Sequence, residues 1–124
     1  MPKSATNTGY IPRGKTGSED AHWVPNTDVY ATDNMIVIKV ELAGISKEDL
    51  DLTVDGNKMT VSGVRRDQQR SSDCRFQLME IDYGEFSTVV DVPEGYDISQ
   101  AKAAYHSGFL RIEVPKISVD IPVE

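Results

Sequence analysis

Apolar and polar residues alternate with a period of two in several short segments of this 124-residue chain. In residues 35–42, four aliphatic side chains fall on one face of an extended strand, whereas Lys39 and Glu41 fall on the other. Such segments are separated by Gly, Pro and Asp, and no long helical period lies between them. The pattern therefore predicts an all-β fold, an antiparallel immunoglobulin-like β-sandwich, rather than an α/β fold.

Two pairs of these segments are predicted to form hairpins. Residues 50–54 and 59–61 flank Asp55-Gly56-Asn57, and residues 101–105 and 110–114 flank Ser107-Gly108. Both connections contain glycine, which adopts the positive φ that a tight antiparallel turn requires. We expect about eight strands in all, and one short helical turn at 46–49 with Ser46 as its N-cap.

Composition and charge narrow the classes of partner. Twenty acidic against thirteen basic residues give a formal net charge of −7, which repels nucleic acid and anionic lipid surfaces. The longest aliphatic run is only 35–38, so no membrane insertion is expected, and the apparent lack of a signal peptide predicts a cytoplasmic protein. A single cysteine, Cys74, and two distant histidines predict neither an intrachain disulfide nor a metal site, and no cofactor is expected.

Changes in composition along the chain predict three parts. Residues 1–22 are polar and are expected to form a flexible N-terminal arm, because they offer too few apolar groups to offset the entropy of ordering. Residues 23–116 carry the strand pattern and form the domain. Residues 117–124 form a C-terminal extension after Pro115, which ends the last strand.

Four motifs in order carry a resemblance to a known family. They are residues 23–30, residues 40–50, Tyr83-Gly84-Glu85-Phe86, and residues 103–110, in which Ala103, Gly108 and Leu110 match a turn motif with Ser107 in place of the usual Asn. The C-terminal Ile121-Pro122-Val123 is similar to a tail motif of the same family. The chain thus resembles the alpha-crystallin domain of small heat shock proteins, in their bacterial and plant branch.

The resemblance implies an ATP-independent holdase chaperone that binds partly unfolded client proteins and forms dimers and higher homo-oligomers. It implies that the Ile121-Pro122-Val123 tail docks in an edge groove of a neighbouring subunit. The groove would be lined by two sets of alternate residues, Leu50, Leu52 and Val54 on one strand and Ala101, Ala103 and Tyr105 on another. The alternative is that Val119, Ile121 and Val123 form one more edge strand of the same molecule.

A long connection, residues 65–82, contains an apolar segment that is predicted to be a strand. In the family branch that the chain resembles, this strand is exchanged between two subunits to make the dimer; here it comprises Phe76, Gln77, Leu78, Met79, Glu80 and Ile81. The alternative is a strand that folds back within its own subunit. Thr88 stands where the family usually has an arginine that pairs with a glutamate such as Glu80, so that cross-dimer ion pair is not expected here.

Two other functions are alternatives to the chaperone. An enzyme is not favoured, because the sequence contains no phosphate-binding loop, nucleophile elbow or metal motif. A monomeric or dimeric co-chaperone-like adaptor on the same sandwich is the stronger alternative. The tail and the long connection favour the assembling chaperone, because both are expected only in that branch.

Overall fold

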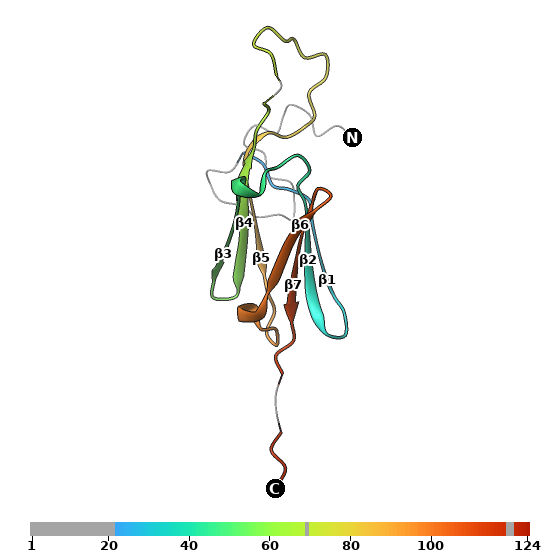
Figure 1. The fold of residues 1–124 in the computed structure, drawn as a ribbon, viewed down its shortest axis with the longest axis vertical. Coiled ribbons are helices and arrows are strands. Elements are labelled where there is room, and N and C mark those ends of the chain that lie inside the picture. The colour runs from blue at the N-terminus through green and yellow to red at the C-terminus, as the bar shows by residue number, and fades with distance from the viewer. Residues whose placement is uncertain (1–21, 69, 119–120) are drawn as a thin grey trace.

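The computed structural model describes residues 22–68, 70–118 and 121–124, and within them the chain folds into two antiparallel sheets (Figure 1). One sheet has the strand order β1-β2-β7-β6 and the other has the order β3-β4-β5. The antiparallel β-sandwich predicted from the alternation is therefore confirmed. The elements are β1 (Thr27–Ala31), β2 (Met35–Glu41), η2 (Lys47–Asp49), β3 (Leu50–Asp55), β4 (Lys58–Arg65), β5 (Gly84–Asp91), η3 (Ile98–Gln100), β6 (Lys102–His106) and β7 (Phe109–Pro115).

The core lies between the sheets and is built from the inward-facing alternate residues that the sequence pattern predicted. On β2, Ile36, Ile38 and Val40 are buried, and β7 contributes three more aliphatic side chains in register with them. Trp23 and Phe86 meet with their ring centroids 5.1 Å apart. The remaining members of the core cluster are Leu42, Ile45, Met59, Val61, Val90, Val92, Leu110, Ile112 and Val114.

The segment before β1 closes one side of the sandwich. Trp23 forms a parallel bridge with Phe86 of β5, and the Ser87 amide donates to the Trp23 carbonyl at 3.3 Å. Since β1 follows Trp23 by only a few residues, the β1 and β5 edges lie on the same side of the sandwich. The edges of β3 and β6 therefore lie together on the opposite side.

Both predicted hairpins are present, and the turn between β6 and β7 is of the kind that matches the strand twist. Ser107 has φ of 52° and Gly108 has φ of 84°, so both central residues of the turn are left-handed. This is the type I′ arrangement, in which asparagine and glycine are favoured and serine is not. The structure thus explains why the matching family motif has Asn where this chain has Ser107.

Replacing Ser107 with asparagine is expected to stabilise the domain by about 0.5 kcal/mol, because asparagine tolerates the left-handed conformation better than serine does. Thermal unfolding followed by circular dichroism measures the change. Ser118→Asn is the control, because Ser118 is exposed and does not have a positive φ. A melting temperature that did not rise in Ser107→Asn, or rose equally in both variants, would contradict the assignment of the turn.

Three sequence predictions differ from the structure. The described residues contain seven strands rather than eight, because residues 76–81 lie within the connection between β4 and β5 without forming a strand. An extended segment needs a neighbouring edge for its backbone hydrogen bonds, and the described residues place none beside this one. Ser46 occupies the N-cap position of η2, but its side chain makes no capping hydrogen bond, since this exposed residue can leave the backbone amides to water.

The predicted N-terminal arm comprises residues 1–22. Of these, residues 1–21 lie outside the residues that the structure describes. Regular structure begins at the Trp23 bridge and ends near Lys116, which pairs with Tyr96. None of the helices in the described residues has the length and apolar character needed to span a membrane.

Candidate peptide-binding groove

The edges of β3 and β6 are unpaired within the part of the chain that the structure describes. β3 pairs only with β4, and β6 pairs only with β7. An unpaired edge presents a row of backbone N–H and C=O groups that can accept another extended chain. Because the two edges lie on the same side of the sandwich, they frame one candidate groove.

The six predicted groove residues form a gradient of burial along these edges. Leu50, Ala101 and Tyr105 are partly buried and pack against the core cluster. Leu52 and Val54 are 38% and 49% exposed, and Ala103 is also exposed. The structure therefore gives the groove a base continuous with the core and an apolar strip that is open to a ligand.

Tyr105 fixes one end of the groove, a role that the sequence pattern did not reveal. Its hydroxyl donates to the Leu42 carbonyl at 2.5 Å and accepts a hydrogen bond from the Ile45 amide at 3.4 Å. The end of β6 is thereby tied to the connection that leads into β3. The other members of the turn motif have separate roles: Leu110 is buried in the core, and Gly108 forms the turn.

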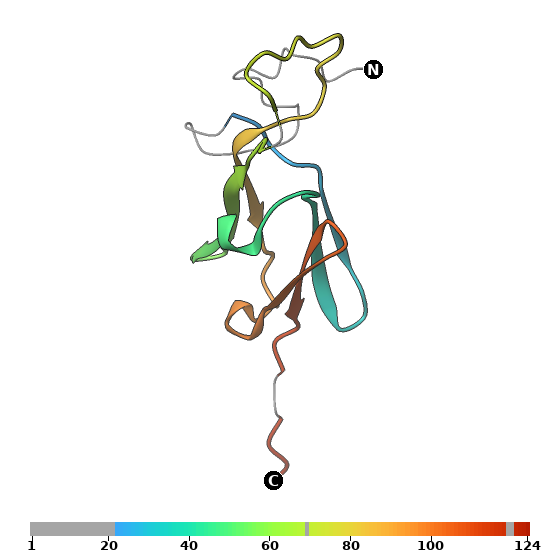
Figure 2. The same cartoon turned by 45° about the horizontal axis from the view of Figure 1, so that its top comes forward.

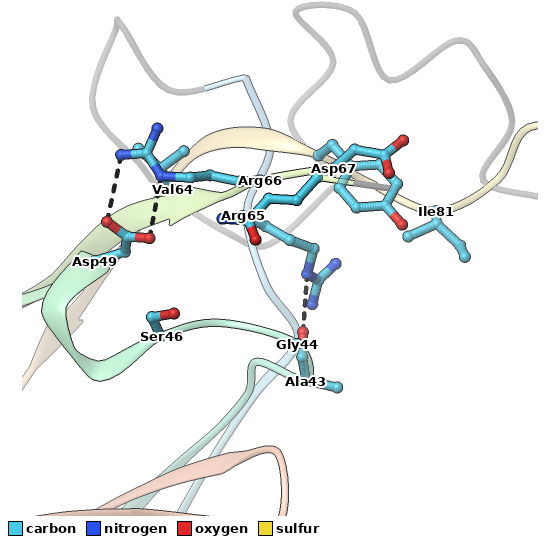
Figure 3. Close-up of a pocket in the computed structure, with 11 residues that line it drawn as sticks. Ala43, Gly44, Ser46, Asp49, Val64, Arg65, Arg66, Asp67 and Ile81 are labelled. Atoms are coloured by element: carbon cyan, nitrogen blue, oxygen red, sulfur yellow. Dashed lines mark hydrogen bonds and ion pairs between the residues drawn. The ribbon is translucent and has the colours of Figure 1, made fainter. Parts of the chain in front are cut away.

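A pocket of about 500 Å³ lies between the connection that leads into β3 and the end of β4 (Figure 3). Ser46 and Asp49 line it from the connection before β3, and Arg65 and Arg66 line it from the end of β4. Arg66 forms a two-pronged ion pair with Asp49 through Nε and one terminal nitrogen, at 3.1 and 3.3 Å. This pair raises the pKa of Arg66, so the side chain carries its full positive charge.

Arg65 holds three distant segments together at the same place. Its Nε donates to the Ala43 carbonyl at 3.0 Å, and a terminal nitrogen donates to the Asp82 carbonyl at 2.9 Å. The guanidinium also lies 4.4 Å from the Trp23 ring centroid. Burial lowers the pKa of Arg65, but an arginine remains charged at neutral pH. Sequence reasoning missed this residue because its partners are mostly backbone carbonyls, which no residue type reveals.

The connection between β4 and β5, which we call the exchange arm (residues 66–83), projects from the sandwich (Figure 2). Its apolar side chains are exposed: Phe76 by 51%, Leu78 by 72% and Ile81 by 62%. Arg70 lies over the Phe76 ring at 4.5 Å. The alternative of a strand folded back into its own subunit is not observed in the described part of the arm.

Thr88 lies on the inward face of β5, in register with Val61 of β4, and is 4% exposed. It is therefore buried between the sheets of its own subunit and does not present a side chain to solvent. Glu80 corresponds to the glutamate that pairs with the family's usual arginine at the Thr88 position. It is partly exposed on the arm.

The C-terminal tail leaves the sandwich at the end opposite the exchange arm (Figure 1). Ile121 is 83% exposed and Val123 is 95% exposed. The alternative in which they form an edge strand of their own molecule is not observed, because residues 121–124 form no strand; Val119 lies outside the described residues. Among the described residues, the last backbone hydrogen bond before the tail joins the Ile117 amide to the Gly95 carbonyl, at 2.8 Å.

The chain matches a known protein family along most of its length. The family model described as Hsp20/alpha crystallin matches residues 28–123. The chain belongs to the Hsp20/alpha crystallin family. The resemblance inferred from the four motifs is therefore confirmed.

Relatives in this family are named as heat shock and spore proteins. Spore protein SP21 of Stigmatella aurantiaca is 32% identical over 94 residues, which cover 76% of this chain and 56% of that protein. Small heat shock protein C2 of Rickettsia felis is 27% identical over 101 residues, which cover 82% of this chain and 66% of that protein. The chain thus spans less than two thirds of the length of these relatives.

Solved structures of Hsp20 proteins share the fold. A small heat-shock protein from Xylella fastidiosa, whose crystal structure is described as having a distinct high order structure, superposes with a TM-score of 0.73 at 27% identity. The match covers 82% of this chain and 94% of that one. The Hsp20 family consists of non-enzymatic chaperones, which agrees with the prediction that this chain is not an enzyme.

Proposed function

We propose that this protein is a cytoplasmic, ATP-independent holdase that binds partly unfolded proteins and prevents their aggregation. The observation that carries the proposal is that β3 and β6 each have an edge left unpaired by the described residues, and that Leu52 and Val54 on β3 are exposed apolar residues. A groove of this kind binds an extended aliphatic segment by strand addition, with backbone hydrogen bonds giving affinity and alternate side chains entering the apolar strip. Its occupants are the tails of other subunits and extended segments of clients.

The tail has the chemistry of such an occupant. Ile121 and Val123 are alternate residues, so in an extended chain both point to the same face, and Pro122 stiffens the backbone between them. Burying each of these side chains contributes about 1.5–3 kcal/mol, whereas association costs at least about 4 kcal/mol of rigid-body freedom. One tail therefore binds weakly, and several tails in one assembly bind firmly while each can still leave singly.

The attachment of the tail favours docking between subunits. The hydrogen bond from Ile117 to Gly95 fixes the chain at the base of the sandwich, and only residues 118–120 separate it from Ile121. Three residues reach at most about 11 Å when extended, which leaves little chain to turn back along its own β6 edge. The tail points away from its own sandwich (Figure 1), which favours docking on a second copy.

We also propose that the exchange arm pairs with a partner subunit. The arm exposes an apolar strand-forming sequence, and β1 is an edge strand on which Val29 and Tyr30 are 44% and 42% exposed. Residues 76–81 could add to the β1 edge of a second copy. The backbone N–H and C=O groups of both segments would then have hydrogen-bond partners. Exchange between two copies would give a dimer with twofold symmetry.

Deletion of residues 121–123 tests tail docking and separates the holdase from the adaptor. We expect the intact chain to form oligomers by multi-angle light scattering, and the deleted chain to form smaller particles that suppress client aggregation differently. If the intact chain is monomeric, and deletion changes neither its size nor its suppression of aggregation, the adaptor is the correct function.

Leu52→Asp is expected to leave the domain folded and to weaken docking of the tail. Leu52 is already 38% exposed, so a carboxylate there costs little in the free subunit, but it would be desolvated beneath Ile121 or Val123. Thr53→Asp on the same strand is the control, because Thr53 alternates to the other face. Oligomer size measured as a function of concentration reports the effect. Equal assembly of wild type and Leu52→Asp would place the docking site elsewhere.

A further inference from the structure

Arg70 gathers three other side chains of the exchange arm around its guanidinium. Its Nε donates to the Asp67 carboxylate at 2.7 Å, and its Cζ lies 4.5 Å from the ring centroid of Phe76 and 5.9 Å from that of Tyr83. The side chains of Arg70 and Asp67 are only 35% and 22% exposed, although the arm projects from the sandwich. We call these four residues the Arg70 cluster.

The cluster brings together the two ends of the segment that is proposed to pair with a partner subunit. Phe76 begins that segment, and Tyr83 follows it directly before β5. The distances of 4.5 and 5.9 Å start from the same carbon atom, so the two ring centroids are at most about 10.4 Å apart, the sum of the two.

A straight strand does not fit within this distance. If the chain runs extended from Phe76 into β5, seven steps of about 3.3 Å separate Phe76 from Tyr83, roughly 23 Å in all. Each ring lies only a few ångströms from its own backbone, so the rings cannot make up the difference by turning toward each other. The arm can therefore keep the Arg70 cluster or present residues 76–83 as one straight strand, but it cannot do both.

We infer that the Arg70 cluster is an autoinhibitory contact, which holds the exchange arm in a closed loop and must open before the arm pairs with a second copy. This inference rests on the proposed exchange of the arm. The hydrogen bond from Arg65 keeps the Asp82 carbonyl on the sandwich, so opening moves the Phe76 end of the segment. The cluster is weak enough to open, because an ion pair or a cation–π contact of exposed groups changes an equilibrium only about two- to fivefold.

Replacing Arg70 with glutamine in the full chain tests this inference. Glutamine keeps a polar side chain at this place but removes the ion pair and the cation between the two rings, so the closed loop loses stability relative to the extended arm. We expect the affinity of the dimer to rise about three- to tenfold, as measured by sedimentation velocity over a dilution series. An unchanged affinity would overturn the inference, and so would a lower one, which would show that Arg70 contacts the partner subunit.

Arg75→Gln is the matched control. Arg75 lies on the same arm, is exposed, and makes no ion pair or ring contact within the part of the chain that the structure describes. This variant changes the net charge by the same amount as Arg70→Gln, so an equal rise in affinity in both would reduce the effect to charge alone and overturn the inference.

A second variant tests whether the members of the cluster act together. Asp67→Asn is expected to raise the affinity less than Arg70→Gln does, because the ring contacts of Arg70 remain. Added to Arg70→Gln, it is expected to have little further effect, since its partner is already gone. Fully additive effects would contradict a single cluster.

Hydrogen–deuterium exchange reads the closed loop without relying on dimer affinity. In the arm, the Cys74 amide donates to the Ser71 carbonyl and the Asp73 amide donates to the Ser71 hydroxyl. In a chain that also carries Leu78→Asp and Ile81→Asp, which is expected to stay monomeric, Arg70→Gln should speed exchange at these amides and Arg75→Gln should not. Equal exchange in the two chains would overturn the inference.

The chain with Leu78→Asp and Ile81→Asp also separates this inference from the proposed exchange. If these two substitutions leave the dimer unchanged, the exchange of the arm fails and the inference fails with it. If they weaken the dimer and Arg70→Gln behaves like Arg75→Gln, exchange stands and the autoinhibitory role of the Arg70 cluster is wrong.

Discussion

Replacing Gly63 with alanine is expected to lower the free energy of unfolding by about 3 kcal/mol, and the melting temperature by roughly 10 °C. Gly63 lies in β4 on the face that points between the sheets, in register with Leu50 and Phe86. A Cβ atom built at this position would lie 2.0 Å from the backbone oxygen of Asp49 and 2.9 Å from the Phe86 ring. A backbone oxygen and a packed ring cannot move aside as a flexible side chain can, so the clash must distort the start of β3.

Gly44→Ala is the matched control for this prediction. Gly44 has φ of 75°, so alanine there is strained, but nothing lies within 4 Å of the added carbon. The cost is therefore only that of the left-handed conformation, about 1 kcal/mol. Chemical denaturation of both variants should rank Gly63→Ala as the more damaging change. The opposite order would show that the connection before β3 does not cross β4 as closely as the structure has it.

Gly63 illustrates how far the sequence predicts this fold. The alternation of residues 35–42 predicts which side chains of β2 are buried, because the period of two is a local property of an extended chain. The glycine turns after Val54 and Tyr105 predict both hairpins for the same local reason. Nothing near Gly63 in the sequence indicates that the carbonyl of Asp49 passes over it, because that contact joins segments that only the folded sandwich brings together.

The candidate site shows the same division between local and distant information. The alternate residues of β3 and β6 were predicted from their pattern and the family resemblance, and the structure places them on two unpaired edges on one side. The hydroxyl bonds of Tyr105 and the carbonyl contacts of Arg65 were missed, since backbone acceptors have no sequence signature. The apolar pattern of residues 76–81 predicted a strand that the structure does not contain, because a strand also requires an adjacent edge and the described residues supply none beside this segment.

The exchange arm and the tail lie at opposite ends of the sandwich (Figure 2). The β3 and β6 edges that frame the candidate groove are the outer strands of the two sheets. If the arm and the tail dock as proposed, these attachment points would allow a subunit to contact its exchange partner and its tail partners at the same time. The two kinds of contact also differ in size: six residues of the arm present several apolar side chains, whereas a tail presents two. We therefore expect dilution to separate tail-linked dimers from one another before it separates the two subunits of a dimer.

Changing both Leu78 and Ile81 to aspartate is expected to weaken dimer formation at least about a hundredfold, since each buried aliphatic side chain contributes about 1.5–3 kcal/mol and a buried carboxylate costs more. In the free subunit these side chains are 72% and 62% exposed, so the substitutions should not lower the stability of the sandwich. Sedimentation velocity measures the monomer–dimer equilibrium, and circular dichroism checks the fold.

Ser71→Asp together with Ser72→Asp is the control for this change, because it adds the same charge to an exposed polar part of the same arm. A dimer weakened only by the substitutions at Leu78 and Ile81 would support burial of the apolar segment of the arm against a second copy. Equal dimer affinity in all variants would show that this segment stays in solvent. The subunits would then have to associate through another edge of the sandwich, and the exposed aliphatic groups of the arm would be available to clients instead.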